Sequence, residues 1–216
     1  MILAMETSSL VCGASLHDNN ECIAEVYLKE PRVHAEKLVG LVNQLFEEQK
    51  IRVQKLTAVV VSAGPGSFTG LRIGMSFAKG LVYPHQIPLA GVNTMKAFIA
   101  GTIDEINRTK TTLWVIRSHK DYIYTALFTT ELDDIDIRYG QIHNIKEWYP
   151  ECAAIICNDS LEEIKDIPVI ERSILPSMIG NYYMCHKRDT AVKDYDSLVL
   201  EYGMDYKPKE WKPGTA

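Results

Sequence analysis

The glycine-rich stretch at residues 62–81, SAGPGSFTGLRIGMSFAKGL, narrows the folds open to this chain more than any other segment. It follows the apolar run LTAVVVSA, which is typical of a buried strand, and it leads into a helical pattern that Pro84 ends. A glycine-rich turn between a strand and a helix either holds a phosphate or lets two backbones approach closely. These two alternatives imply different functions.

Neither common nucleotide motif fits the stretch. A Walker loop requires G-x-x-x-x-G-K-[ST], but Leu71 follows Gly70. A dinucleotide fingerprint requires G-x-G-x-x-G, and Gly64, Gly66 and Gly70 are spaced one residue too widely. What remains is a tight turn and a helix start. Such a start attracts anions, and simple capping of the helix accounts for its hydroxyls equally well.

Candidates for contact with an anion or a nucleotide come from the end of the first strand and from the glycine loop. They are Glu6, Thr7, Ser8, Gly64, Gly66, Ser67, Thr69 and Arg72.

Small residues recur along one face of the helix expected at 69–83. Gly70, Gly74 and Ala78 are spaced four residues apart, so they share one stripe. Glycine inside a helix costs about 0.5–1 kcal/mol relative to alanine, so a close contact is expected to compensate. The neighbour is either the sheet of the same domain or a helix of another subunit.

The order of expected elements repeats along the chain. Three strands between residues 2 and 28 predict an antiparallel meander, followed by helix, strand, helix, strand and helix. The order recurs from Leu113 with weaker helices, which predicts two α/β subdomains with mixed sheets flanked by helices. We place them at 1–104 and 105–216, with the tail at 198–208 returning to the first. Helices are expected at 34–49, 69–83 and 176–188.

Composition excludes several classes of protein. The 216 residues carry a net charge of −5, so the overall basic excess of a nucleic-acid binder is missing. No apolar run is long enough for a membrane span, and no charged leader is evident. The five cysteines include no C-x-x-C pair, which favours reduced thiols over a disulfide framework or a zinc ribbon. We therefore expect a cytoplasmic protein that does not contact membranes.

Three segments together resemble one bacterial family. ILAMETSS, HAEKLVGLV and SAGPGSFTGLRIGMSFAKGL, in this order and spacing, are similar to the TsaB family, also called YeaZ. The resemblance covers the first hundred residues, and the tail MDYKPK is a loose version of the family's P-x-Y-x-R ending. It implies two RNase H-like subdomains, as in actin, Hsp70 chaperones and sugar kinases. It also implies a role in making threonylcarbamoyladenosine beside the tRNA anticodon.

The resemblance also implies partners. TsaB supports its catalytic paralogue TsaD, the ATPase TsaE joins them, and TsaC supplies the threonylcarbamoyl-adenylate. No cofactor is then expected on this chain, with ATP or ADP and Mg bound at the level of the complex and tRNA reached through the complex. A homodimer formed by the same surface would compete with the heterodimer.

The residues argue that this chain is not itself the catalyst. The catalytic paralogue binds a metal through H-x-x-x-H, whereas here Leu38 stands four residues after His34, so we expect no metal site. Glu6 matches the family's D/E-T-S motif but lacks an acidic partner for magnesium. Arg117 and Lys120 occupy the region where a second phosphate loop would begin. A stand-alone ATP-binding or ATP-hydrolysing enzyme of the actin-like fold remains the alternative, and a metalloprotease-like glycoprotease is a weaker one.

A helical interface is the preferred hypothesis. By resemblance, the helices at 34–49 and 69–83 pack with their counterparts in TsaD as a pseudo-symmetric four-helix contact. The candidate interface residues are Ala35, Val39, Val42, Gly70, Gly74 and Ala78.

Overall fold

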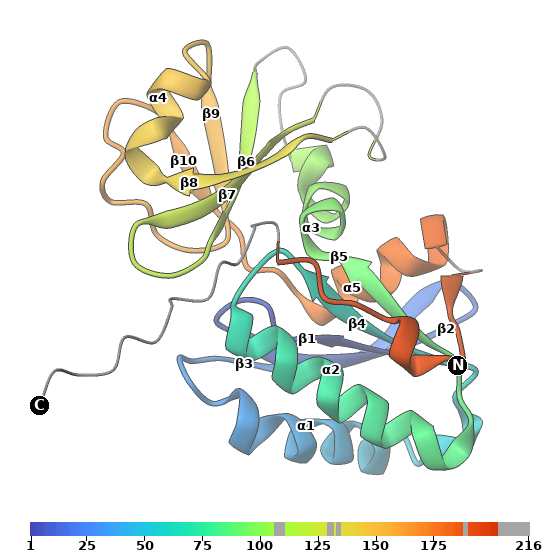
Figure 1. The fold of residues 1–216 in the computed structure, drawn as a ribbon. Coiled ribbons are helices and arrows are strands. Elements are labelled where there is room, and N and C mark those ends of the chain that lie inside the picture. Colours follow the sequence, from blue (N-terminus) through green and yellow to red (C-terminus); the bar gives the residue numbers. More distant parts are fainter. Residues whose placement is uncertain (106–110, 129–131, 133–134, 188–189, 203–216) are drawn as a thin grey trace, which may run out of the picture.

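Two five-stranded sheets form the two lobes of the protein (Figure 1). The computed structural model describes residues 1–105, 111–128, 132, 135–187 and 190–202. The first sheet contains β1 (Ile2–Glu6), β2 (Val11–Asp18), β3 (Glu21–Lys29), β4 (Ala58–Gly64) and β5 (Leu89–Asn93). The second contains β6 (Thr112–Arg117), β7 (Tyr122–Leu127), β8 (Ile137–Gln141), β9 (Ala154–Cys157) and β10 (Val169–Glu171).

The two sheets share one topology. The first has the order β3-β2-β1-β4-β5, and the second, taken from its other edge, has the order β8-β7-β6-β9-β10. In each sheet the first three strands are antiparallel and the last two join parallel to the first. The predicted fold class, a pair of related mixed sheets with flanking helices, is confirmed.

Helices cover the first sheet on both faces. They are α1 (His34–Glu48), α2 (Phe68–Val82), α3 (Thr94–Thr102) and α5 (Pro176–Tyr182), while α4 (Ile145–Trp148) belongs to the second sheet. On one face, α1 and α2 pack side by side over a core that includes Leu38, Leu45 and Met75. On the other face, Phe98 of α3 and Trp114 of β6 belong to one apolar cluster that joins the lobes.

The last helix packs on the first sheet, although we grouped residues 105–216 as one unit. Helix α5 contacts β1, β2 and β3, and a five-residue π-helix, Tyr183–Lys187, continues it. A Cβ at Gly180 would lie 2.1 Å from Nε2 of His17, so the absence of a side chain there permits the close approach. Together with α3, helix α5 covers the face of the first sheet opposite α1 and α2. The outer face of the second sheet is covered by the short α4.

The chain then returns over the first lobe. The Tyr195 hydroxyl donates to the carbonyl of Ile87 at 2.9 Å, and the Glu201 amide donates to the carbonyl of Ala63 at 2.7 Å. Part of the predicted tail, residues 203–208, lies outside the described residues. Among the described residues, no helix has both the length and the apolar character needed to span a membrane.

Candidate functional site

The glycine loop packs tightly against the chain's own backbone. Gly64 ends β4 with φ +114°, and a Cβ there would fall 2.0 Å from the carbonyl oxygen of Glu201. A Cβ at Gly66 would fall 2.5 Å from the carbonyl oxygen of Ser8, which accepts the amide of Ser67 at 2.7 Å. The protein's own backbone therefore occupies the space beside Gly64 and Gly66 that a side chain would need.

The stripe of small residues on α2 faces the end of β1. A Cβ at Gly70 would lie 2.0 Å from the carbonyl oxygen of Thr7, and one at Gly74 would lie 2.2 Å from Thr7 Oγ1. Ala78 is fully buried in the core between α2 and the sheet. The prediction that Gly70, Gly74 and Ala78 admit another subunit is therefore wrong, because α2 crosses β1 with room only for hydrogens.

The interface residues predicted on α1 divide into two groups. Val42 is 1% exposed and belongs to the core, so its assignment to an interface is also wrong. Ala35 is exposed, and Val39 is 47% exposed. The apolar period of α1 places Leu38 and Val42 toward the sheet, which leaves the position between them on the surface.

Glu6 and Thr7 are sealed inside the first lobe with no exposed surface. Glu6 Oε1 accepts hydrogen bonds from the Ser8 amide at 2.8 Å and the Ser8 hydroxyl at 2.6 Å, while Oε2 has no partner among the residues that the structure describes. Burial raises the pKa of Glu6 to about 7, against the lowering effect of the Ser8 and Ser62 hydroxyls. Both side chains, proposed from the sequence as anion contacts, are therefore closed off from the surface of the protein.

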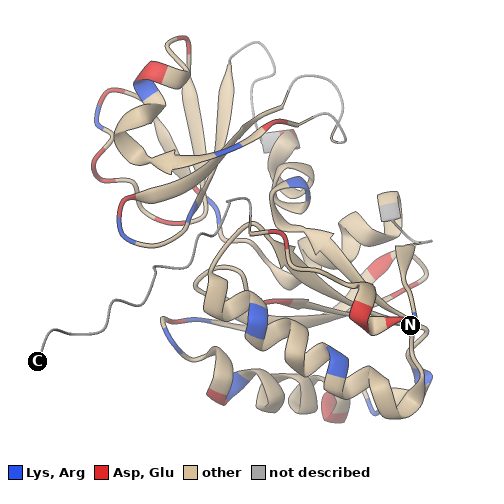
Figure 2. Cartoon of the chain, in the orientation of Figure 1, with Lys and Arg blue, Asp and Glu red and all other residues tan. Residues whose placement is uncertain are grey.

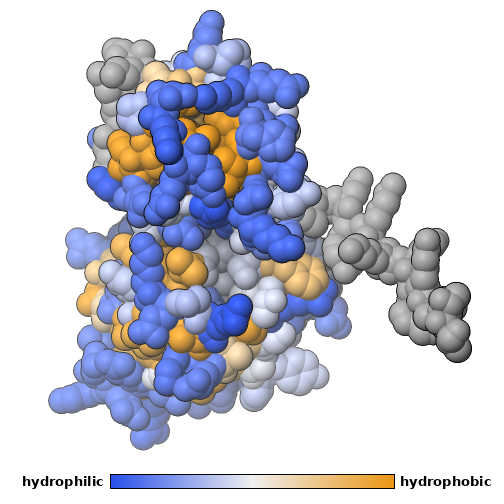
Figure 3. Space-filling model, turned by 90° about the vertical axis from the view of Figure 1, so that its left-hand side faces the viewer, coloured by the Kyte–Doolittle hydropathy of each residue, from blue (hydrophilic) through white to orange (hydrophobic). Residues whose placement is uncertain are grey.

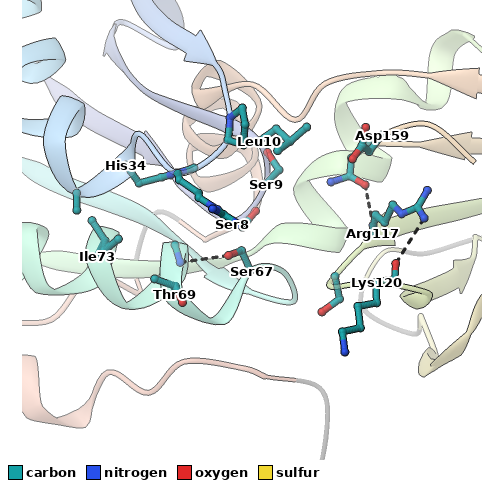
Figure 4. Close-up of a pocket in the computed structure, with 16 residues that line it drawn as sticks. Ser8, Ser9, Leu10, His34, Ser67, Thr69, Ile73, Arg117, Lys120 and Asp159 are labelled. Carbon is teal, nitrogen blue, oxygen red and sulfur yellow. Dashed lines mark hydrogen bonds between the residues drawn. The ribbon is translucent and has the colours of Figure 1, made fainter.

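A cleft of about 550 Å³ lies between the two lobes (Figure 4). The first lobe lines it with Ser8, Ser9, Leu10, Pro31, Arg32, His34, Ala35, Ser67, Thr69, Gly70 and Ile73. The second lobe lines it with Arg117, Ser118, Lys120, Asn158 and Asp159. Figure 3 looks onto the face at the left of Figure 1, where apolar patches lie in both lobes and hydrophilic residues surround them. Three predicted anion contacts, Ser8, Ser67 and Thr69, therefore border one cleft.

Arg72, another predicted anion contact, does not line this cleft. Its guanidinium carbon lies 3.8 Å from the ring centroid of Phe68, and its Nε donates to the Tyr202 hydroxyl at 3.1 Å. The two aromatic rings are themselves 4.8 Å apart between centroids. Arg72 is thus bound to the returning tail, a contact that sequence spacing could not reveal.

The second lobe forms the opposite wall of the cleft from the ends of its own central strands. The Arg117 amide donates to Asn158 Oδ1 at 2.7 Å, and the guanidinium bonds to Glu163 at 2.7 Å and to the Ser160 carbonyl. Sequence reasoning missed Asn158 and Asp159. The sequence did indicate these two residues, because the polar residues NDS follow the apolar strand AAIIC just as TSS follows β1.

Comparison with known proteins places the chain in a family. The sequence model for the family described as TsaD, tRNA N6-adenosine threonylcarbamoyltransferase, matches residues 23–143. The chain belongs to this family. Within it, the relatives named TsaB (YeaZ) are those whose sequences and fold it shares, as the resemblance indicated.

The individual relatives support this placement. The protein named tRNA threonylcarbamoyladenosine biosynthesis protein TsaB of Bacillus subtilis is 33% identical over 99 residues, covering 46% of this chain and 43% of that protein. Its Escherichia coli namesake is 28% identical over 140 residues, covering 65% and 59%. The chain thus spans about half the length of the curated relatives it matches. A solved structure described as YeaZ from Pseudomonas aeruginosa shares the fold, with a TM-score of 0.68, 20% identity, and coverage of 93% and 98%.

His34 is the first residue of α1, where the sequence analysis considered a pair of metal-binding histidines. Its Nε2 lies 3.1 Å from the carbonyl oxygen of Val11, and the side chain is 7% exposed. Leu38, four residues on, is 1% exposed and packs in the core. Within the described residues, no group of three metal-binding side chains is assembled. The face of α1 that carries His34 and Leu38 is buried in this protein.

Proposed function

We propose that this chain is a non-catalytic partner of TsaD in tRNA threonylcarbamoyladenosine biosynthesis. It would act as a scaffold that binds TsaD through the outer face of α1 and α2, with TsaE joining the complex and tRNA bound through it. Family membership supports the pathway. The observation that carries the binding role is the exposure of Val39 on α1, an apolar side chain that is 47% exposed.

The proposed surface differs from the one expected from the sequence. Ala35 and Ile73 border the same cleft, so they lie near one another at the start of the two helices. Val39 and Phe77 stand one turn further along, and Ile73 and Phe77 are only partly buried. We call Ala35, Val39, Ile73 and Phe77 the α1–α2 strip. It takes the place of Gly70, Gly74 and Ala78, which the protein's own sheet covers.

Two features support a non-catalytic role. The imidazole of His34 is held by a backbone carbonyl, and Leu38 leaves it without the second histidine. Glu6 and Thr7, on which the alternative of an independent ATP-hydrolysing enzyme depended, are sealed from the cleft. That alternative therefore loses the acidic side chain that would have held magnesium.

The substitution Val39→Asp tests the proposal. It places a charge in the middle of the α1–α2 strip, where a partner would desolvate it. We expect the affinity for TsaD of the same organism to fall by about 30-fold or more, since a central apolar contact contributes about 2 kcal/mol. The dissociation constant is measured by calorimetry, and the homodimer by light scattering.

Val199→Asp is the matched control, because Val199 is 76% exposed and lies outside α1 and α2. It should leave the affinity unchanged. Unchanged affinity of the Val39 variant would show that the strip is not the interface. If the unaltered chain does not bind TsaD at all, with ATP present or absent, the partner assignment itself is wrong.

A further inference from the structure

We propose that the free edge of β3 pairs with the same edge of a second copy of this chain, which joins the first sheets of the two copies into one continuous sheet. The pairing is antiparallel and two-fold symmetric, with Tyr27 at its centre. It uses a different surface from the α1–α2 strip. The inference therefore goes beyond the binding of TsaD and does not depend on it.

One side of the β3 backbone has no neighbouring strand. β3 is the end strand of the first sheet, and among the described strands it pairs with β2 alone. The Glu30 amide donates to the Leu10 carbonyl at 3.2 Å, and this bond sets the alternation of the ladder. It follows that the backbone groups of Glu25, Tyr27 and Lys29 point away from β2, toward the open edge. Such a row of amides and carbonyls is a template for another strand.

Apolar side chains beside this edge are covered only in part. Tyr27 is 44% exposed. On the other face of the strand, Val26 and Leu28 pack against the core under α1 but are only partly buried. In the symmetric pairing, Tyr27 meets its counterpart, and Val26 faces Leu28 of the second copy. Cross-strand pairs of this kind stabilise a sheet, so a second strand completes the burial that one chain leaves unfinished.

The charges of β3 favour a second copy over an unrelated strand. When two β3 strands run antiparallel about Tyr27, Glu25 of each lies opposite Lys29 of the other, so two pairs of opposite charge form. The Ser177 amide donates to Oε1 of Glu25 at 2.6 Å, so this carboxylate is already held in place. Figure 2 shows acidic and basic residues mixed on the chain of the first lobe, so neither sign forms a block that would keep two copies apart. A strand that complements itself in this way makes an isologous contact.

A β-bulge fixes the register of the pairing. The register between β2 and β3 shifts after Leu16, which leaves Ile23 as the extra residue on β3. A pairing centred on Glu25 would run across this bulge and set two carboxylates opposite each other. A pairing centred on Tyr27 uses the regular residues 25–29 and avoids both problems. Because this ladder is short, we expect a dissociation constant of about 10–100 µM.

Light scattering and sedimentation of the full chain, from about 1 µM to about 300 µM, test the inference. We expect monomers at the low end of this range and dimers at the high end. Lys29→Glu should weaken self-association about 30-fold, since the two-fold axis counts the altered pair twice. Glu25→Lys should have a similar effect. An equimolar mixture of these two variants should associate as the unaltered chain does, because every facing pair in the mixed dimer again has opposite charges.

Glu21→Lys is the matched control, because it reverses a charge at an exposed position of the same strand but outside residues 25–29. It should leave self-association unchanged. Thermal midpoints show whether each variant folds, and Lys29→Glu alone decides the matter if Glu25→Lys does not fold, since Glu25 also accepts the Ser177 amide.

Three results would overturn the inference. The first is an unaltered chain that stays monomeric at about 300 µM. The second is a loss in Glu21→Lys equal to that in Lys29→Glu. The third is a dimer that Val39→Asp abolishes and Lys29→Glu leaves intact, because that dimer would form through the α1–α2 strip.

Discussion

Replacing Gly70 by alanine is expected to destabilise the fold by about 3 kcal/mol or more. The added Cβ would lie 2.0 Å from the carbonyl oxygen of Thr7, an atom of a fully buried backbone. Since this oxygen cannot rotate away, either α2 must lift from β1 or the strand end must shift. Urea denaturation measures the change in the free energy of unfolding.

Gly80→Ala in the same helix is the matched control. A Cβ there would meet nothing within 4 Å, so the substitution should stabilise the protein by about 0.5–1 kcal/mol through helix propensity. The two substitutions should therefore change the free energy of unfolding in opposite directions. If Gly70→Ala unfolds at the same urea concentration as the unaltered chain, α2 does not pack on Thr7 as described.

This contrast explains why the glycine pattern alone was ambiguous. The spacing of Gly70, Gly74 and Ala78 correctly indicated a close contact, but it carries no information about which backbone approaches. Both a sheet and a second subunit require the same missing side chains. In the structure the neighbour is the protein's own sheet, because Thr7 at the end of β1 lies against Gly70 and Gly74.

The fold was largely predictable because its signals are local. Alternating and apolar runs identified the strands of the first sheet and four strands of the second, and the repeated order indicated two related lobes. The three-residue β10 was missed, because so short a strand shows no pattern of its own. Long-range packing was not predictable in the same way. No local signal says that α5 returns to the first sheet, or that Glu201 lies against Gly64.

The sequence named three of the residues that border the cleft, but it did not predict the cleft itself. Ser8, Ser67 and Thr69 follow strands of the first lobe and were identified as candidates. Arg117 and Lys120 were noted only as departures from a nucleotide loop, since their proximity to those hydroxyls depends on how the lobes meet.

Two buried titratable groups predict how stability depends on pH. The pKa of Glu6 is raised from 4.5 to about 7 by burial, so between these values the native state holds a proton that the unfolded state has lost. Stability contributed by this group therefore falls as pH rises, by about 3 kcal/mol over the window. Burial lowers the pKa of His17 from 6.5 to about 4, so its contribution rises with pH by a similar amount.

The two contributions oppose each other between pH 4.5 and 6.5, and Glu6→Gln separates them. The amide keeps an oxygen that can accept from Ser8, as Oε1 does, but it cannot ionise. We expect the variant to match the unaltered chain near pH 4.5 and to exceed it by about 3 kcal/mol at pH 7.5, measured by urea denaturation at each pH. Glu47→Gln, at an exposed position of α1, controls for the loss of one charge. A difference between Glu6→Gln and the unaltered chain that does not change with pH would mean that Glu6 is ionised in the folded protein. In that case water or a cation would have to reach Oε2, and the carboxylate would again be available to the cleft.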